Sequence, residues 1–191
     1  PVRYAARVEY DGTDFAGFQV QPGRRTVQGE LEIALSRISG GGRVRVDGAG
    51  RTDAGVHAMG QVIAFTYSGR LPANALVVAL RAVVPPDVGN GTLWRGQAGF
   101  RPRHAAQRRE YRYSIWNGPR SPLRERFALG YRDVLDVEAM DQAAQVLVGR
   151  HDFSAFGGYE RQPIRTLHRV RVRMIIEKKI AEVSEIPATS M

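Results

Sequence analysis

The segment from residue 47 to 61, DGAGRTDAGVHAMGQ, places Arg51, Thr52, Asp53 and His57 on a stretch that holds four glycines. Glycine allows positive φ angles and lets another backbone approach closely. A carboxylate two residues after an arginine, on such a loop, can be an ionised group in a cleft, where it acts as nucleophile or general base. The alternative is local: Asp53 caps a turn, and Arg51 pairs with it at the surface. A P-loop is excluded, because no Lys-Ser/Thr pair and no helical pattern follow.

Three other titratable side chains in or near this segment have simpler interpretations. We expect His57 to stabilise the loop through a hydrogen bond, with proton transfer as the alternative. Asp11 begins Asp-Gly-Thr, a turn signal, and Asp47 precedes a glycine. We therefore expect both aspartates to form turns, with a catalytic role as the alternative.

The residues that usually bind metals are few and scattered. The chain has no cysteine, which excludes a disulfide scaffold, a cysteine nucleophile and a thiolate metal site. Its histidines, at positions 57, 104, 151 and 168, include no pair at the i,i+4 spacing. We expect no metal site.

Arginine dominates the charge of the chain. Lysine and arginine together number 28 against 19 acids, which gives a net charge of +9. Residues 101–132 alone carry nine arginines against two acids, Glu110 and Glu125. Such a surface attracts a polyanion, because each neutralised phosphate releases counterions. The charge therefore indicates a nucleic-acid partner, with an ordinary basic protein as the alternative.

The residue patterns of the first hundred positions predict interleaved strands and helices. Residues 2–10 alternate between apolar and polar, which predicts a strand that ends in the turn after Tyr10. Thr26 is placed to cap a helix over 27–38, and three glycines follow that helix. The further elements expected are a short strand at 44–46, a central strand over 61–67 and a helix from 72 to 83.

The second half repeats this alternation. Residues 110–116 and 167–174 predict strands, and Asp136 is placed to cap a helix that ends at Gly149. No run supports an all-parallel sheet. The sequence therefore predicts an α+β fold whose two halves share one mostly antiparallel sheet, with helices packed on one side. The regions expected are a first half at 1–100 that carries the Asp53 segment, a second half at 101–174 and a tail at 175–191.

No stretch is long enough to cross a bilayer as a helix. The longest apolar run, Ala75–Leu80, has six residues, whereas a spanning helix needs about 20. The first residues, Pro-Val-Arg-Tyr, lack the apolar region of a secretory signal. We expect a cytoplasmic protein with no membrane partner.

Several blocks of the sequence resemble one family. The residues Gly50–Ala58, GRTDAGVHA, match the active-site loop of the tRNA pseudouridine synthase A family throughout. Further matching blocks follow the family order: YDGT at 10–13, TVQ at 26–28, the spaced Phe100, Arg103, Arg109, Tyr111 and Tyr113, and the G-x-H-D-F-x-x-F turn at 149–156. The resemblance covers residues 3–174 and implies two ferredoxin-like halves.

The resemblance implies that the chain isomerises uridine to pseudouridine in the anticodon stem-loop of tRNA, at positions 38–40. No metal or cofactor is needed. Residue by residue, it makes Asp53 the catalytic residue, either as a nucleophile or as a base for a sugar proton. Tyr111 matches the tyrosine that stacks on the extruded uracil, with core packing as the alternative. Arg51 matches the arginine that replaces the flipped base and pairs with Asp53.

The resemblance also implies tRNA contacts and a homodimer. We expect Arg103 and Arg109, which belong to a matching block, to bind the RNA. Arg24 and Arg25 precede a predicted helix and are expected to contact phosphate, with simple exposure to solvent as the alternative.

Residues 175–191 do not match the family pattern, which continues with a strand and a helix that help to close the cleft. The composition changes there as well, because all 26 arginines precede residue 175 and both lysines follow it. This favours a junction in the coding sequence, with natural truncation as the alternative. We expect an incomplete second half and a tail that is at most a thin helix along Ile176, Ile180 and Val183, unable to replace a strand. An RNA-binding protein with little turnover is therefore the alternative function.

Overall fold

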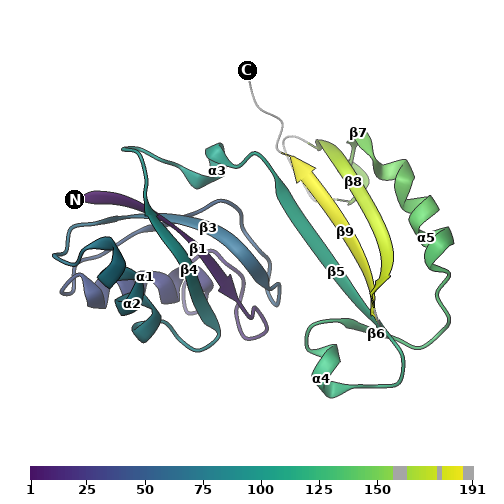
Figure 1. The fold of residues 1–191 in the computed structure, drawn as a ribbon, viewed down its shortest axis with the longest axis horizontal. Helices are drawn as coiled ribbons and strands as arrows, with labels where there is room; N and C mark the ends of the chain where they lie inside the picture. Colours follow the sequence, from purple (N-terminus) through teal and green to yellow (C-terminus); the bar gives the residue numbers. More distant parts are fainter. Residues whose placement is uncertain (157–162, 176–177, 187–191) are drawn as a thin grey trace. The chain divides into compact units, whose positions relative to one another are not determined.

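A computed structural model describes residues 1–156, 163–175 and 178–186 of the chain. It divides into two units, Pro1–Ala105 and Ala106–Met191. Figure 1 labels the elements of both units. None of the helices in these ranges is long and apolar enough to cross a membrane.

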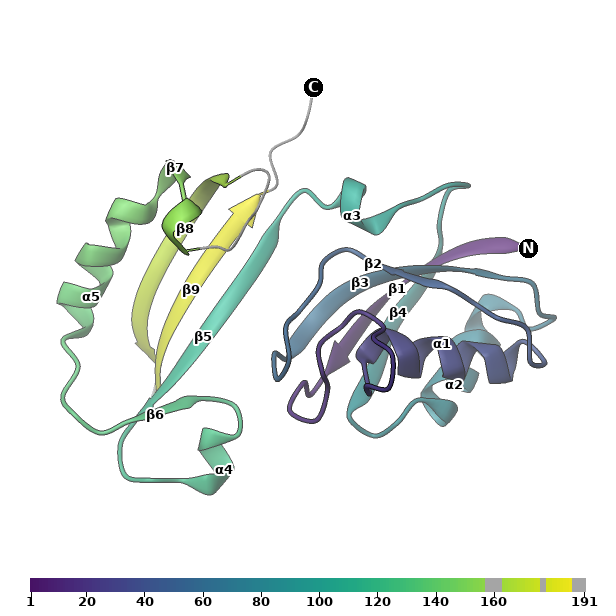
Figure 2. The ribbon, with the colours of Figure 1, turned by 180° about the vertical axis from the view of Figure 1, so that it is seen from behind.

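Unit 1 has the βαββαβ order of a ferredoxin-like fold. Its elements are β1 (Val2–Tyr10), α1 (Val27–Ile38), β2 (Val46–Gly48), β3 (Ala58–Tyr67), α2 (Ala73–Val83), β4 (Val88–Arg95) and a short α3 (Pro102–Ala105). The strands form an antiparallel sheet in the order β2-β3-β1-β4. Helices α1 and α2 lie on one face of it (Figure 2). The predicted α+β class is confirmed, and β3 is an interior strand as expected.

Helix α1 begins where its local signals predict. The Thr26 hydroxyl accepts a hydrogen bond from the backbone N–H of Gly29 at 3.2 Å, which satisfies one donor that a helix start leaves unpaired. Its buried side chains recur every three or four residues, at Val27, Leu31, Ala34 and Leu35. This spacing turns one stripe of the helix toward the sheet.

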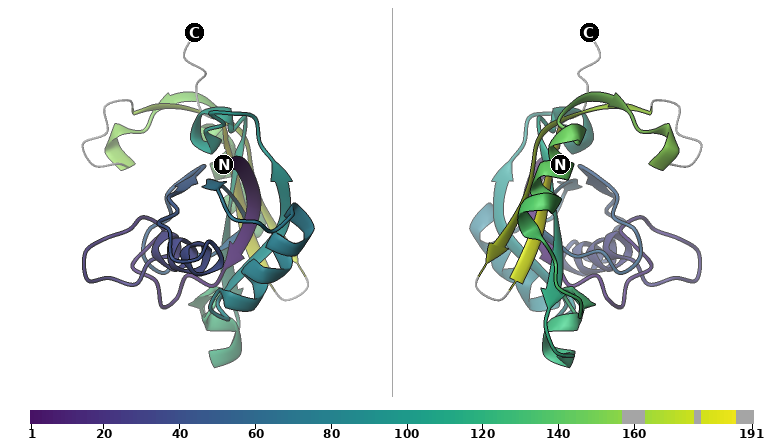
Figure 3. Two further views of the ribbon diagram at one scale, coloured as in Figure 1. Left: turned by 90° about the vertical axis from the view of Figure 1, so that its left-hand side faces the viewer. Right: turned by 90° about the vertical axis from the view of Figure 1, so that its right-hand side faces the viewer.

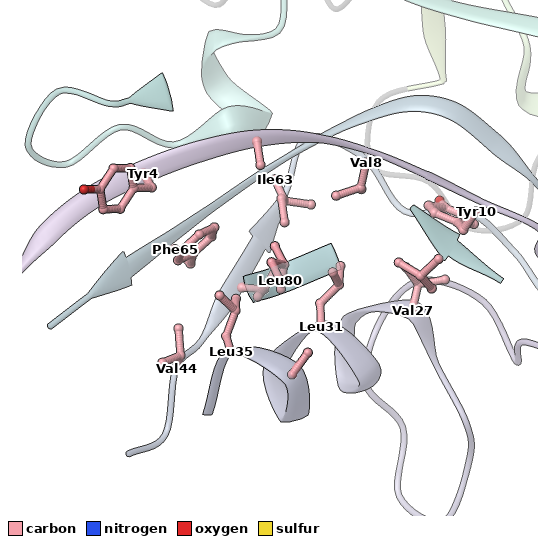
Figure 4. Close-up of a cluster of buried hydrophobic side chains, with 14 of the residues drawn as sticks. Tyr4, Val8, Tyr10, Val27, Leu31, Leu35, Val44, Ile63, Phe65 and Leu80 are labelled. Atoms are coloured by element: carbon pink, nitrogen blue, oxygen red, sulfur yellow. The ribbon is translucent and has the colours of Figure 1, made fainter. Parts of the chain in front are cut away.

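The core of unit 1 lies between the sheet and its helices, as Figure 4 shows. Leu31 and Leu35 of α1 and Leu80 of α2 are fully buried against Ile63 and Phe65 of β3. Each such side chain contributes about 1.5–3 kcal/mol through removal from water. This packing holds β1 and β3, the two strands from whose ends the site loops extend.

Unit 2 contains a second sheet and one helix longer than a single turn among its described residues. Its elements are β5 (Arg109–Asn117), α4 (Pro122–Glu125), β6 (Leu129–Tyr131), α5 (Val137–Ala144), β7 (Gly149–Asp152), β8 (Ile164–Ile175) and β9 (Lys178–Ile186), with 3-10 turns at Gln145–Leu147 and Ser154–Phe156. Asp136 caps α5 as predicted, since its Oδ1 accepts from the N–H of Ala139 at 2.9 Å.

Helix α5 lies against β8, alongside the sheet (Figure 3). Two side chains of the segment that follows Asp136 bind the strand backbone. Asp141 accepts a hydrogen bond from the N–H of Val172 at 2.6 Å, and Gln145 donates to the carbonyl of Val170 at 3.1 Å.

The expectation of one sheet shared by both halves is wrong for the described strands. The second sheet has its own order, β6-β5-β9-β8-β7. Within its unit, β5 pairs antiparallel with β9 along residues 109–115 and parallel with β6 at residues 115–117.

The expectation for the tail is also wrong. Residues 178–186 form β9, which pairs antiparallel with β5 on one side and with β8 on the other. Ile180 and Val183 lie at helical spacing, but isoleucine and valine favour strands, and both residues belong to β9. A short isolated helix is marginal in water because its nucleation is costly, whereas β5 and β8 offer backbone edges with which this segment pairs. Residues 178–186 therefore add a strand to the sheet of unit 2.

Candidate active site

The segment singled out by its sequence forms a loop at one end of the unit 1 sheet. Residues 49–57, which we call the Asp53 loop, connect β2 to β3. They lie where β1 ends, because Tyr10 pairs with Ala58, the first residue of β3. The connection after β1, residues 11–26, packs against this loop.

Backbone hydrogen bonds join the two loops. The N–H of Phe18 donates to the carbonyl of Thr52 at 2.9 Å, and the N–H of Gly55 donates to the carbonyl of Phe15 at 3.3 Å. Phe15 and Phe18 are both buried. The Asp53 loop is thus tied, on both sides of Asp53, to a segment that is itself held in the core.

Glycines make this close approach possible. A Cβ atom at Gly12 would overlap the carbonyl of Val56, and one at Gly17 would lie 2.8 Å from the carbonyl oxygen of Thr52. Gly17 also has a φ of 99°, which side chains rarely adopt. The expected close approach at a glycine of the segment 47–61 occurs at Gly48, whose Cβ would lie 2.5 Å from the Phe18 ring, and the 11–26 segment contributes Gly12 and Gly17.

His57 joins the loops from the other end, as the stabilising interpretation predicted. Its Nδ1 accepts a hydrogen bond from the N–H of Gly12 at 3.0 Å and lies 3.0 Å from Oδ1 of Asp11. Asp11 accepts in turn from the N–H and the hydroxyl of Thr13, at 3.1 and 2.6 Å. Asp11 is therefore the turn-forming residue that we expected.

Asp47 is not a turn-forming residue. It lies in β2 and forms an ion pair with Arg3 of β1, at 2.5 Å. The turn was expected because a glycine follows Asp47. Gly48 instead belongs to β2, where the absence of a side chain leaves room for the ring of Phe18.

The start of the Asp53 loop is held by β3. The N–H of Ala49 donates to the carbonyl of Val62 at 2.8 Å. The side-chain amide of Gln61 donates to the carbonyl of Gly50 at 3.0 Å. The backbone on both sides of the Arg51–Asp53 segment is therefore held, which favours a single geometry for its side chains.

Thr52 is also held by its side chain. The hydroxyl oxygens of Tyr10 and Thr52 lie 2.8 Å apart in a hydrogen bond. Tyr10 is buried in the core, and burial raises the pKa of its phenol, while hydrogen bonds to Thr52 and Gln61 act in the opposite direction. The phenol therefore stays protonated at neutral pH.

Arg51 and Asp53, on either side of Thr52, are both exposed. Within the described residues neither side chain has a hydrogen bond or an ion pair. It is the Asp53 carbonyl, not its carboxylate, that accepts from the N–H of Val56 at 3.2 Å. The local interpretation, in which Asp53 caps a turn and pairs with Arg51, is therefore wrong. The loop presents an exposed carboxylate and an exposed guanidinium to an incoming ligand.

Comparison with known proteins decides which family has this loop. A family model described as tRNA pseudouridine synthase matches residues 6–93. A tRNA pseudouridine synthase A from Lacticaseibacillus casei is 41% identical over 174 residues, which cover 89% of this chain and 70% of the relative. The protein of that name from Thermosipho melanesiensis is 44% identical over 173 residues, with the same two shares. The one from Shouchella clausii is 48% identical over 155 residues, or 81% of this chain and 59% of the relative.

The chain belongs to the tRNA pseudouridine synthase A family. The predicted resemblance is thereby confirmed, and with it the assignment to a family of isomerases. The residues matched by the family model include the whole of the Asp53 loop and the strands that flank it.

Tyr111, the tyrosine of the family pattern, belongs to unit 2. It lies in β5, opposite Val183 of β9, and it is 47% exposed. Tyr113 on the same strand is 57% exposed. Core packing, the alternative interpretation for a strand tyrosine, therefore does not describe either residue.

The four arginines expected to bind RNA have different surroundings. Arg24 and Arg103 are exposed, and Arg103 lies in α3. Arg109 is half-buried at the start of β5. Arg25 makes two hydrogen bonds to Asp87, at 2.6 and 2.9 Å, and its guanidinium carbon lies 4.2 Å from the centre of the Phe15 ring. Arg25 thus has a structural role that its position before a helix did not suggest.

The structure adds Tyr10, Phe18 and Gln61 to the site, as residues that hold the Asp53 loop. Tyr10 begins the YDGT block, but nothing in the sequence indicated that it contacts Thr52. Within the described ranges no group of three histidine or acidic side chains could hold a metal ion.

Proposed function

We propose that this chain isomerises uridine to pseudouridine in the anticodon stem-loop of tRNA, at positions 38–40, and that Asp53 is the catalytic residue. The observation that carries the proposal is the exposed Asp53 carboxylate, which has no side-chain partner among the described residues and stands on an anchored loop. The relatives' name supplies the substrate and the reaction. Since tRNA is the substrate, the proposed place of action is the cytoplasm.

The reaction rearranges bonds without adding or removing atoms overall. The N1–C1′ bond of the uridine breaks, the uracil turns, and C5 forms a bond to C1′. The proton on C5 leaves to solvent, and N1 gains one. The Asp53 carboxylate either attacks C1′ as a nucleophile or removes a sugar proton as a base.

Two further side chains have proposed roles in exposing the base. Arg51, whose guanidinium is planar and exposed, fills the place of the flipped uridine in the RNA stack and pairs with Asp53 when tRNA is bound. Tyr111, exposed on β5, stacks on the extruded uracil. Extrusion costs a few kcal/mol, and such contacts offset that cost. Arg24, Arg103 and Arg109 are proposed to bind phosphates, and the homodimer stays a prediction from the family.

The loss of the C5 hydrogen provides the test. Anticodon-arm tRNA labelled with tritium at C5 of uridine should release tritium to water when incubated with the chain. A matched RNA with cytidine at positions 38–40 should release none. Binding of the first RNA without any release would contradict the proposal and support the alternative of an RNA-binding protein with little turnover. Equal release from both RNAs would overturn the assignment of the modified positions.

A further inference from the structure

The hydrogen bond between Tyr10 and Thr52 has no part in the proposed chemistry, yet it lies beside the residues that perform it. Thr52 stands between Arg51 and Asp53 in the chain, and Tyr10 is the last residue of β1. The two hydroxyl oxygens are 2.8 Å apart. A contact between residues 42 positions apart in the sequence connects the core strand directly to the catalytic segment.

Tyr10 is well placed to act as a rigid support. It is 4% exposed, and its ring packs against Phe15 and Phe18 with centroid separations of 6.5 and 6.4 Å. A buried ring on a central strand has few alternative rotamers. The hydroxyl at its tip is therefore held at one position, which an exposed polar side chain could not achieve.

Thr52 is held both by its side chain and by its backbone. Its hydroxyl binds Tyr10, and its carbonyl accepts from the N–H of Phe18 at 2.9 Å. Thr52 is half-buried, whereas Arg51 and Asp53 on either side are exposed. Holding the middle residue inward leaves the flanking side chains directed to solvent.

We propose that Tyr10 is a positioning residue for Asp53, acting through the hydroxyl of Thr52. The inference rests on the proposed function, because it assumes that the Asp53 carboxylate meets the substrate. A displacement of about 1 Å at a reacting group can lower a rate about 10²-fold. The Tyr10–Thr52 hydrogen bond opposes such a displacement at the residue next to Asp53.

The test compares single-turnover rates of the full chain with saturating tRNA. Tyr10→Phe removes only the hydroxyl, and it should lower the rate about 10- to 100-fold, with the Kd for tRNA changed less than about twofold. Thr52→Val should have the same effect, and Thr52→Ser, which keeps a hydroxyl, should restore a rate near that of the unaltered chain. The Tyr10→Phe/Thr52→Val double variant should be no slower than either single variant, because both remove one interaction.

Tyr67→Phe is the matched control. Tyr67 is a buried tyrosine of the same core cluster, on β3, and its hydroxyl has no hydrogen-bond partner among the described residues. Its removal should leave both the rate and the denaturation midpoint unchanged or slightly improved. A second readout is independent of turnover: hydrogen exchange of the Phe18 amide, which donates to Thr52, should become faster in Tyr10→Phe and not in Tyr67→Phe.

The outcomes separate this inference from the proposed function. If Asp53→Asn abolishes turnover while Tyr10→Phe stays within about twofold of the unaltered chain, the positioning role is refuted and the catalytic assignment stands. Rate losses that multiply in the double variant would also refute it. If Asp53→Asn retains the full rate, the proposed function fails first and the positioning role fails with it. If Tyr10→Phe does not fold, Thr52→Val and Thr52→Ser decide the question.

Discussion

The guanidinium of Arg25 binds the carboxylate of Asp87 through two hydrogen bonds, at 2.6 and 2.9 Å. The same guanidinium stacks on the buried ring of Phe15. Residue 11 also donates its N–H to the backbone carbonyl of Asp87, at 3.0 Å. The 11–26 loop is thus attached at both of its ends to the residue that precedes β4, and the Asp53 loop in turn is attached to this loop.

Replacing Arg25 should therefore affect stability more than its exposure suggests. Arg25→Ala should lower the free energy of unfolding by about 1 kcal/mol. About half of this comes from the ion pair with Asp87, whose contribution is small because the pair is exposed and screened by salt. The rest comes from the contact with the Phe15 ring. Arg24→Ala, at an exposed neighbour, should change it by less than about 0.5 kcal/mol. Urea denaturation of the two variants measures the difference, and equal midpoints would contradict the structural role.

The same pair predicts a dependence on pH. Mainly through its hydrogen bonds, Arg25 holds the pKa of the Asp87 carboxyl below its ordinary value of 3.8. Because the folded-state pKa is the lower one, the stabilisation is complete above the unfolded-state value and is lost as the pH falls toward the folded-state value. Denaturation between about pH 6 and pH 3 should show a steeper loss for the unaltered chain than for Asp87→Asn. Parallel curves would show that Asp87 contributes nothing to this slope.

The glycines of the 11–26 loop should tolerate no side chain where they meet the Asp53 loop. Gly12→Ala would push a methyl group into the Val56 carbonyl, which should cost about 1–3 kcal/mol and lower turnover as well. Gly42→Ala is the control, since no described residue would lie within 4 Å of a Cβ atom there, and it should be neutral or slightly stabilising. Denaturation midpoints check both variants, and a Gly12→Ala chain as stable as Gly42→Ala would refute the close approach.

Binding to tRNA should weaken steeply with salt. Six arginine–phosphate contacts would imply a loss of about 10³ in affinity between 50 and 200 mM salt. Arg103→Ala should remove about one phosphate contact and so reduce the slope of log K against log salt concentration by about one. Arg25→Ala should leave the salt dependence unchanged, because the Arg25 guanidinium already binds Asp87. Arg124→Ala should also leave it unchanged, because the Arg124 guanidinium lies 3.9 Å from the centre of the Trp116 ring. A flat salt dependence would exclude the arginines of residues 101–132 as a phosphate-binding surface.

Elements with strong local signals were predictable from the sequence. Helix α1 has the Thr26 cap and a regular apolar stripe, and β1 alternates along its whole length. Strand β4 was missed, because VGNGTLWR contains two glycines and owes its conformation to pairing with β1. Strand β9 was missed because it too depends on pairing, with β8 on one side and with β5, which lies far from it in sequence, on the other.

The Asp53 loop was recognisable from the sequence, but the contacts that hold it were not. Arg51 and Asp53 stood out because their types and their glycine-rich surroundings suit chemistry. The Tyr10–Thr52 and Arg25–Asp87 contacts join residues 42 and 62 positions apart, and no local pattern encodes such pairings. The sequence therefore indicated Arg51 and Asp53 as candidate site residues and Arg25 as an RNA contact, whereas the structure shows which residues hold the loops.

The most direct measurement is tritium release from anticodon-arm tRNA by the Asp53→Asn chain. Asparagine keeps the size of the side chain and removes its charge, so folding and tRNA affinity should stay close to those of the unaltered chain. We predict a rate at least about 10³-fold lower, while Asp133→Asn, at an exposed aspartate of unit 2, releases tritium at the normal rate. Undiminished release by a folded Asp53→Asn chain would contradict the assignment of Asp53 as the catalytic residue.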